Sequence, residues 1–103
     1  MNSVHRGRQG ELLAEQWLKQ RGFLDIHHNL QTPFAQVDLT ARKNGVFYLF
    51  EVKMSASLPQ IQVNQWNRLH RASLYLRTDR LMLIWIHQDH IQAFHLQPPH
   101  ERE

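Results

Sequence analysis

The alternation of apolar and polar positions along the chain predicts two helices and five strands. Apolar residues recur at helical spacing in residues 7–23 and 63–78, so that each segment would have one apolar face. Alternating or continuous apolar runs are typical of strands, and they occur at residues 23–30, 36–43, 46–54, 80–87 and 90–96. The order α-β-β-β-α-β-β indicates an α/β fold with a mixed central sheet flanked by helices.

The length and composition of the chain bound its organisation. We expect a single domain over residues 1–97 and a polar C-terminal tail at 98–103, because 103 residues bury one modest core. No apolar run approaches the ~20 residues that span a bilayer, so we expect no membrane partner. The first residues lack the apolar segment of a secretory signal, and the chain has no cysteine. These features predict a cytoplasmic protein.

Asn44-Gly45 is the strongest hairpin signal in the chain. A two-residue turn at this dipeptide pairs Lys43 with Val46 and, in the same register, places Asp38 opposite Glu51. Facing residues on antiparallel strands point to the same side of the sheet. A three-residue loop with a bulge is an alternative that would shift this register by one residue.

The hairpin therefore groups Asp38, Glu51 and Lys53, which lies two residues beyond Glu51 on the same side. Facing carboxylates repel each other, and a divalent cation between them would remove that repulsion. A nearby lysine could then orient or deprotonate a water, or stabilise charge on a phosphate. The alternative is a solvated strand face carrying a weak surface ion pair.

A third carboxylate, Glu11, shares a helix stripe with Ala14 and Leu18 and is expected to face the sheet. The alternative explanation is the preference of acidic residues for the first turn of a helix. Gly7 and Gly10 are predicted to lie at that helix start, where exposed N–H groups with Arg6 or Arg8 could meet a phosphate.

Several motifs in this order resemble the YraN family and, more distantly, archaeal Holliday-junction resolvases, both of the PD-(D/E)XK nuclease superfamily. They are Gly10-Glu11, then Val37-Asp38-Leu39, then Glu51-Val52-Lys53, followed by the helix at 65–76. The resemblance covers residues 7 to 86 and implies a restriction-endonuclease-like α-β-β-β-α-β core, here with an added C-terminal strand.

The resemblance also implies chemistry. It implies that Glu11, Asp38 and Glu51 are metal-binding carboxylates for Mg²⁺ or Mn²⁺, with the backbone carbonyl of Val52 as a further ligand. Lys53 would be the catalytic lysine, and Glu11, Asp38 and Glu51 complete the catalytic set. The substrate would be DNA, including branched or structured DNA, and a homodimer would be the expected assembly.

The chain also departs from the family pattern. Ala35-Gln36 stands where the family usually shows Gly-Glu, and Asn64 beside Gln65 stands where the second helix often carries a lysine. No basic residue closely follows Lys53, although the family often has one there. The departures favour an alternative: a nuclease-fold module that binds nucleic acid or a protein partner without cleavage. A purely structural interaction domain is a third possibility.

The net charge of +3 is compatible with a polyanionic partner. We expect the nucleic-acid contacts to come from Arg6, Arg8, Gln36, Gln65, Arg68 and Arg71. Further basic residues on the helices, Lys19, Arg21 and Arg77, could contribute, although a charged helix face is usually only solvated. The three tryptophans are expected in the core rather than stacked on bases, and the eight histidines lack the spacing of a zinc site.

Overall fold

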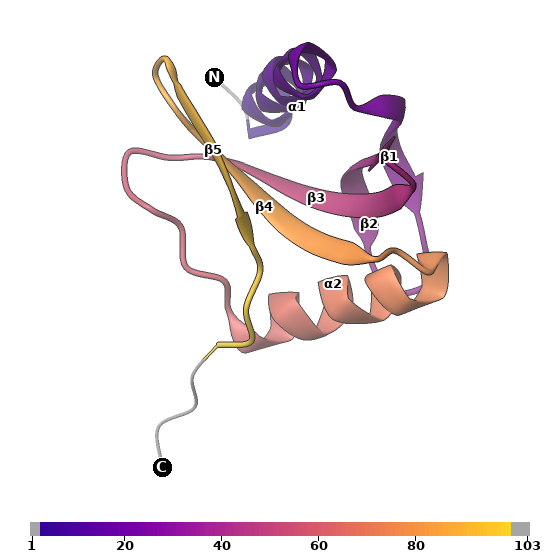
Figure 1. Cartoon of the computed structure of the whole chain (residues 1–103). Coiled ribbons are helices and arrows are strands. Elements are labelled where there is room, and N and C mark those ends of the chain that lie inside the picture. The colour runs from indigo at the N-terminus through magenta and orange to yellow at the C-terminus, as the bar shows by residue number, and fades with distance from the viewer. Residues whose placement is uncertain (1–2, 100–103) are drawn as a thin grey trace.

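Two helices cover opposite faces of a five-stranded sheet in the computed structural model, which describes residues 3–99, with side chains from residue 7 (Figure 1). The elements are α1 (Ser3–Gln20), β1 (Leu24–Gln31), β2 (Gln36–Lys43), β3 (Val46–Met54), α2 (Val63–Leu76), β4 (Arg80–His87) and β5 (His90–His95). The predicted order and the mixed α/β fold are therefore confirmed. Arg6's side chain and residues 100–103 of the predicted tail lie outside this description.

The strands lie side by side in the order of the sequence, β1-β2-β3-β4-β5. Only β3 and β4 run parallel, and α2 makes the crossover between them, as parallel neighbours require. The other three pairs are antiparallel. No helix in the described part of the chain is long and apolar enough to cross a membrane.

The β2–β3 hairpin has the predicted two-residue turn. Asn44 and Gly45 have φ values of 53° and 78°, as a type I′ turn requires at both central positions. Lys43 pairs with Val46, and the same register continues to the pair of Leu39 with Phe50. The bulged three-residue alternative is excluded, and the next position beyond this ladder is that of Asp38 and Glu51.

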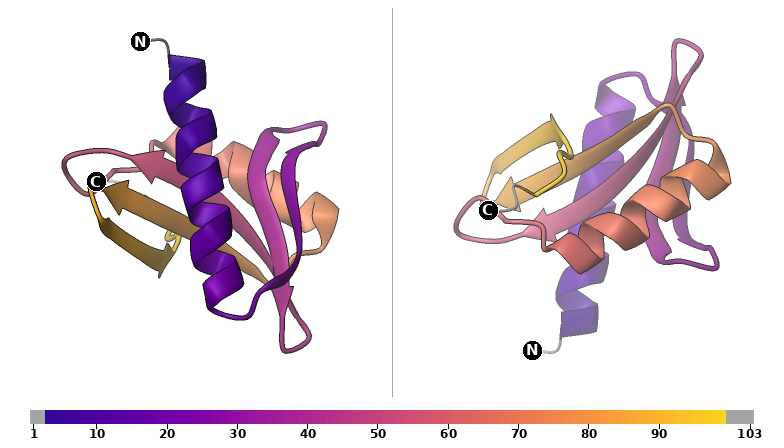
Figure 2. Two further views of the ribbon diagram at one scale, coloured as in Figure 1. Left: turned by 90° about the horizontal axis from the view of Figure 1, so that it is seen from above. Right: turned by 90° about the horizontal axis from the view of Figure 1, so that it is seen from below.

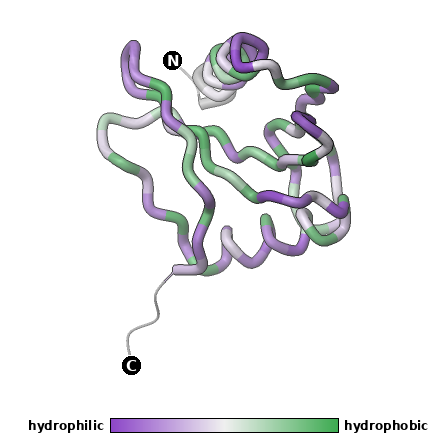
Figure 3. Tube along the Cα trace, viewed as in Figure 1, coloured by the Kyte–Doolittle hydropathy of each residue, from purple (hydrophilic) through white to green (hydrophobic). Residues whose placement is uncertain are grey.

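Alternate side chains of β3 pack against different helices. Phe50 lies in the larger core cluster with Ala14 and Leu18 of α1, whereas Leu49 lies in a second cluster with Ala72 of α2. The tube in Figure 3 shows the hydrophobic stretches that run along the central strands between the helices. Odd-numbered residues of β3, including Glu51 and Lys53, therefore face the α2 side.

The start of α1 differs from the sequence prediction. The helix begins at Ser3, so Gly7 and Gly10 lie inside it and present no free helix start to a phosphate. Gly10 is fully within the packed face, because a Cβ at this position would lie 3.0 Å from Met54 Cγ and 3.5 Å from Val52 Cγ1. The glycine allows α1 to approach β3 closely, which is the physical reason for its place in a helix.

We expect Gly10→Val to destabilise the fold by about 1–3 kcal/mol, because added methyl groups overpack the contact with Met54 and Val52. Gly7→Val is the matched control: Gly7 is exposed and has no atom within 4 Å of its would-be Cβ. The measurement is urea unfolding of both variants. Equal midpoints for the two variants would contradict a close α1–β3 contact at Gly10.

Candidate active site

Asp38 lies where the ladder between β2 and β3 ends. The last backbone pair is Leu39 with Phe50, and beyond it Asp38 Oδ2 accepts the backbone N–H of Val52 at 2.8 Å. The side chain of Asp38 thus replaces the missing backbone partner and is fixed against β3. This contact places one carboxylate beside the Glu51–Val52–Lys53 segment.

Glu51 is buried, with 8% of the residue exposed, and has two side-chain partners. Its Oε2 atom accepts a hydrogen bond from Gln65 Nε2 of α2 at 2.7 Å. The same oxygen lies 3.5 Å from Lys53 Nζ, whose side chain is 36% exposed. The structure therefore brings Asp38, Glu51 and Lys53 together, with the amine nearest to solvent.

The positive charge near Glu51 is too small to keep the pKa of this carboxyl group at its usual value. Burial, and next the negative charge of Asp38 and a hydrogen bond with its side chain, raise the pKa of Glu51 to about 8. Lys53 opposes this shift but does not cancel it. A divalent cation would reverse the balance, and carboxylate and carbonyl oxygens are the ligands that Mg²⁺ and Mn²⁺ prefer. The pair therefore fits the ion.

Glu11 of α1 lies close enough to Asp38 for the two charges to interact. Its Oε1 atom is buried and has no hydrogen-bond partner in the described part of the structure. Burial, and next the charge of Asp38, raise the pKa of Glu11, whereas His28 and Arg8 lower it. The first turn of α1 has no acidic residue, so the helix dipole does not explain Glu11. An unpartnered carboxylate oxygen near Asp38 is instead consistent with a cation or a bound water.

The three carboxylates do not form a compact ligand cage. Within residues 7–99, no three His, Cys, Asp or Glu side chains are grouped so that they could hold one metal ion. Mg²⁺ commonly uses only one or two protein carboxylates and completes its shell with water and phosphate oxygens. Asp38 and Glu51 meet that requirement, and direct binding by Glu11 stays a prediction.

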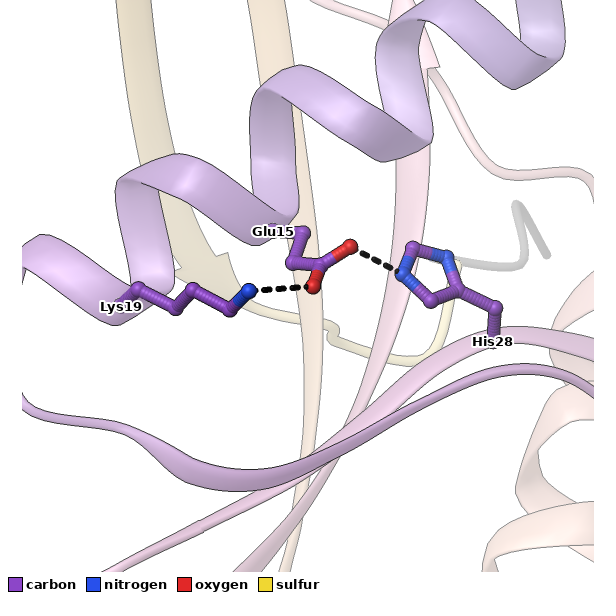
Figure 4. A network of polar contacts seen from close by, with 3 residues as sticks. All are labelled: Glu15, Lys19 and His28. Atoms are coloured by element: carbon purple, nitrogen blue, oxygen red, sulfur yellow. Dashed lines mark hydrogen bonds and ion pairs between the residues drawn. The ribbon is translucent and has the colours of Figure 1, made fainter.

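A polar network that the sequence did not reveal borders Glu11. Glu15 of α1 accepts from His28 of β1 and pairs with Lys19 Nζ at 2.8 Å (Figure 4). Lys19, and next His28, lower the pKa of Glu15. The network joins α1 to β1 and occupies Lys19, which leaves that residue less available for a phosphate. The contact pairs residues 13 positions apart, so no local pattern indicated it.

The residues predicted to contact nucleic acid lie on different sides of the sheet. Arg8 is exposed on α1 beside Glu11, whereas Arg68 and Arg71 are exposed on α2. Gln36 is exposed at the start of β2. Gln65 points to Glu51 instead of solvent and donates a hydrogen bond to it. Its side chain therefore belongs to the candidate site.

The model of the "Uncharacterised protein family UPF0102" matches residues 10–92 of this chain. A UPF0102 protein of Caulobacter sp. (strain K31) is 35% identical over 78 residues, which are 72% of this chain and 56% of that protein. A UPF0102 protein of Maricaulis maris is 34% identical over 86 residues, 80% of this chain and 68% of the relative. The chain thus spans little more than half the length of the Caulobacter relative.

Solved structures with the same fold include a Holliday junction resolvase, Hjc, of Archaeoglobus fulgidus. Its TM-score is 0.72 at 17% identity, over 87% of this chain and 72% of that chain. A second structure, SSO0001, has a TM-score of 0.62 at 21% identity, over 96% of this chain and 54% of that chain. At these identities the similarity shows the fold alone, and it confirms the resolvase-like architecture predicted from the sequence.

Proposed function

This chain belongs to the uncharacterised protein family UPF0102, the YraN family, and we propose that it is a metal-dependent endonuclease acting on DNA. The observation that carries the proposal is the pair of the half-buried Asp38 and the buried Glu51 beside Lys53 at the end of the β2–β3 ladder. Such a pair is costly in a protein that binds no cation there. Branched or structured DNA is the proposed substrate, supported by the fold shared with a Holliday junction resolvase.

Asp38, Glu51 and the backbone carbonyl of Val52 would hold Mg²⁺ or Mn²⁺, with Glu11 contributing directly or through water. Bound there, the ion would supply Lewis-acid stabilisation of phosphate charge and lower the pKa of a water. The protein would act in a cytoplasmic compartment, and a homodimer would suit a two-fold substrate.

The side chains around the pair have separate roles in this proposal. The Val52 N–H fixes the orientation of Asp38, and the Gln65 amide fixes that of Glu51. Lys53 Nζ is held by Glu51 yet remains accessible, so it can approach a phosphate oxygen or hold a proton of the attacking water.

A second proposal is a nuclease-fold module that binds nucleic acid or a protein without cutting. It is supported by the contacts of Glu51, whose Oε2 atom is already satisfied by Gln65 and Lys53 without any ion. The absence of a three-carboxylate group within residues 7–99 points the same way. The two proposals differ in whether the site cuts DNA.

The experiment is a Mn²⁺ titration of thermal stability, with cleavage of single-stranded, duplex and branched DNA followed in parallel. Mn²⁺ at 100 times its dissociation constant should stabilise the wild type by about 2.7 kcal/mol. Asp38→Asn should be as stable as the metal-free wild type or more so, because asparagine can still accept the Val52 N–H and removes the repulsion. The variant should show no stabilisation by Mn²⁺.

Equal Mn²⁺-induced shifts for Asp38→Asn and the wild type would contradict a metal site at this position. Metal-dependent stabilisation and DNA binding without cleavage of any substrate would support the second proposal. Binding of neither metal nor DNA would leave a structural interaction domain.

A further inference from the structure

A groove of about 430 Å³ runs between α2 and the connection from β1 to β2. This groove, here the α2 groove, is lined by Pro33, Phe34, Asn64, Asn67, Arg68 and Arg71. The right-hand view in Figure 2 shows α2 on the face of the sheet opposite α1. The α2 groove therefore lies on the same side of the sheet as Glu51 and Lys53, and apart from Arg8.

One stripe of α2 borders the groove and continues past it to Tyr75. Asn64, Arg68, Arg71 and Tyr75 follow the spacing i, i+4, i+7, i+11, which keeps them on one side of a helix. The stripe is about 16 Å long at 1.5 Å per residue, enough for a few nucleotides. It begins directly beside Gln65, which is hydrogen bonded to Glu51. The groove thus leads away from the candidate active site.

Two exposed aromatic rings meet at the groove. Phe34 is 40% and Tyr75 57% exposed, and their ring centroids are 6.2 Å apart at an interplanar angle of 72°. Phe34 is held there by Thr32, a buried residue whose Oγ1 accepts the N–H groups of Phe34 and Ala35 at 3.2 and 3.0 Å. The connection is an ordered turn that presents a phenyl ring to solvent, although burial of that ring would stabilise the fold.

The charge around the rings is positive. From Val52 to Thr78 the sequence contains no acidic residue, although it contains Lys53, Arg68, Arg71 and Arg77. Within residues 7–99, every salt bridge involves Glu15 or Glu51, so neither Arg68 nor Arg71 takes part in one. Both guanidinium groups are available for an anion.

We propose that the α2 groove binds unpaired nucleotides, with bases stacked on Phe34 and Tyr75 and phosphates on Arg68 and Arg71. Exposed aromatic rings interleaved with cations are the chemistry that recognises single-stranded nucleic acid, because every base has a π-face. Paired bases stay within the duplex stack and do not offer that face. The proposal deepens the proposed function, on which it rests for the position of cleavage: the substrate is DNA with a single-stranded segment next to the cut.

The test is equilibrium binding of the full chain to a labelled single-stranded oligo-dT and to a blunt duplex, in EDTA. Phe34→Ala and Tyr75→Ala should each weaken oligo-dT binding about tenfold, the scale of one stacked base, and leave the salt dependence unchanged. Duplex affinity should stay within about twofold, since stacking adds nothing there. Arg68→Ala should weaken both and reduce the salt slope for oligo-dT by about 0.7, the value for one phosphate on a single strand.

Leu74→Ala is the matched control, because Leu74 is 65% exposed on the same helix but lies outside the stripe. It should bind oligo-dT like the wild type, and unchanged melting temperatures should show that all variants fold. Affinity of Phe34→Ala and Tyr75→Ala within twofold of the wild type would overturn the proposal. Equal wild-type affinity for poly-glutamate and oligo-dT would also overturn it, in favour of an acidic peptide. Since EDTA prevents cleavage, a failure of the nuclease proposal would leave these results unaffected.

Discussion

Replacing Lys53 by alanine should slow metal-dependent DNA cleavage by at least about 100-fold, the lower range for loss of a positioned proton-transfer group. DNA affinity should change by less than about threefold, because one phosphate contact at most is lost. The reason is the position of Lys53 Nζ, which is 3.5 Å from Glu51 Oε2 and partly open to solvent. Single-turnover cleavage in Mn²⁺, together with binding in EDTA, separates the two effects.

Lys19→Ala is the control for the removal of a lysine. Lys19 is 63% exposed and pairs with Glu15 on α1, and such surface pairs contribute about 0.3–0.5 kcal/mol. This variant should cleave at the wild-type rate. If Lys53→Ala instead impairs folding or binding while cleavage persists, Lys53 only pairs with Glu51. A wild type that binds DNA and never cuts it would favour the non-catalytic module.

The hairpin at the centre of the site was predictable because its signals are local. Asn44-Gly45 fixes the turn, the turn fixes the register, and the period of two along a strand then places Asp38 and Glu51 together. The prediction needed no knowledge of the helices. It correctly grouped Asp38 and Glu51, which are 13 positions apart, because the pairing set at the turn continues unchanged along a short antiparallel hairpin.

Contacts between elements distant in sequence were not predictable in this way. The hydrogen bond from Gln65 to Glu51 depends on how α2 lies across the sheet. Likewise, the ring of Phe34 meets that of Tyr75 only in the packed structure. The start of α1 was missed because two glycines argue against a helix interior. Packing of Gly10 against Met54 overrides that propensity.

The contact of Gln65 explains how one departure from the family pattern affects the site. A lysine often stands near this point in the family, whereas here Asn64 lines the α2 groove and Gln65 turns toward Glu51. A neutral amide can hold the Glu51 carboxylate in place but adds no positive charge. The pKa of Glu51 therefore stays raised, and we expect the stability of the metal-free site to depend on pH.

Replacing Glu51 by glutamine should stabilise the metal-free protein at pH 7 by about 1–3 kcal/mol, since one pKa unit corresponds to about 1.4 kcal/mol. The pKa of Glu51 rises from 4.5 to about 8 on folding, so the folded state binds the extra proton. Stability of the metal-free wild type therefore falls as pH rises from about 4.5 through 8. Glutamine does not titrate, and its carbonyl can still accept the hydrogen bond from Gln65. The advantage of the variant should vanish toward pH 4.5.

Mn²⁺ should reverse this order, because it binds the wild-type carboxylates and leaves the variant unaffected. The measurement is thermal unfolding at pH 4.5, 6, 7 and 8.5, with EDTA and with Mn²⁺, where 1 kcal/mol corresponds to about 4 °C in a domain of this size. Glu15→Gln is the matched control: Lys19 and His28 lower the pKa of Glu15, so its loss should destabilise the fold above the unfolded-state pKa. A constant difference between Glu51→Gln and the wild type across this pH range would show that Glu51 takes up no proton on folding. The repulsion that calls for a cation would then be absent.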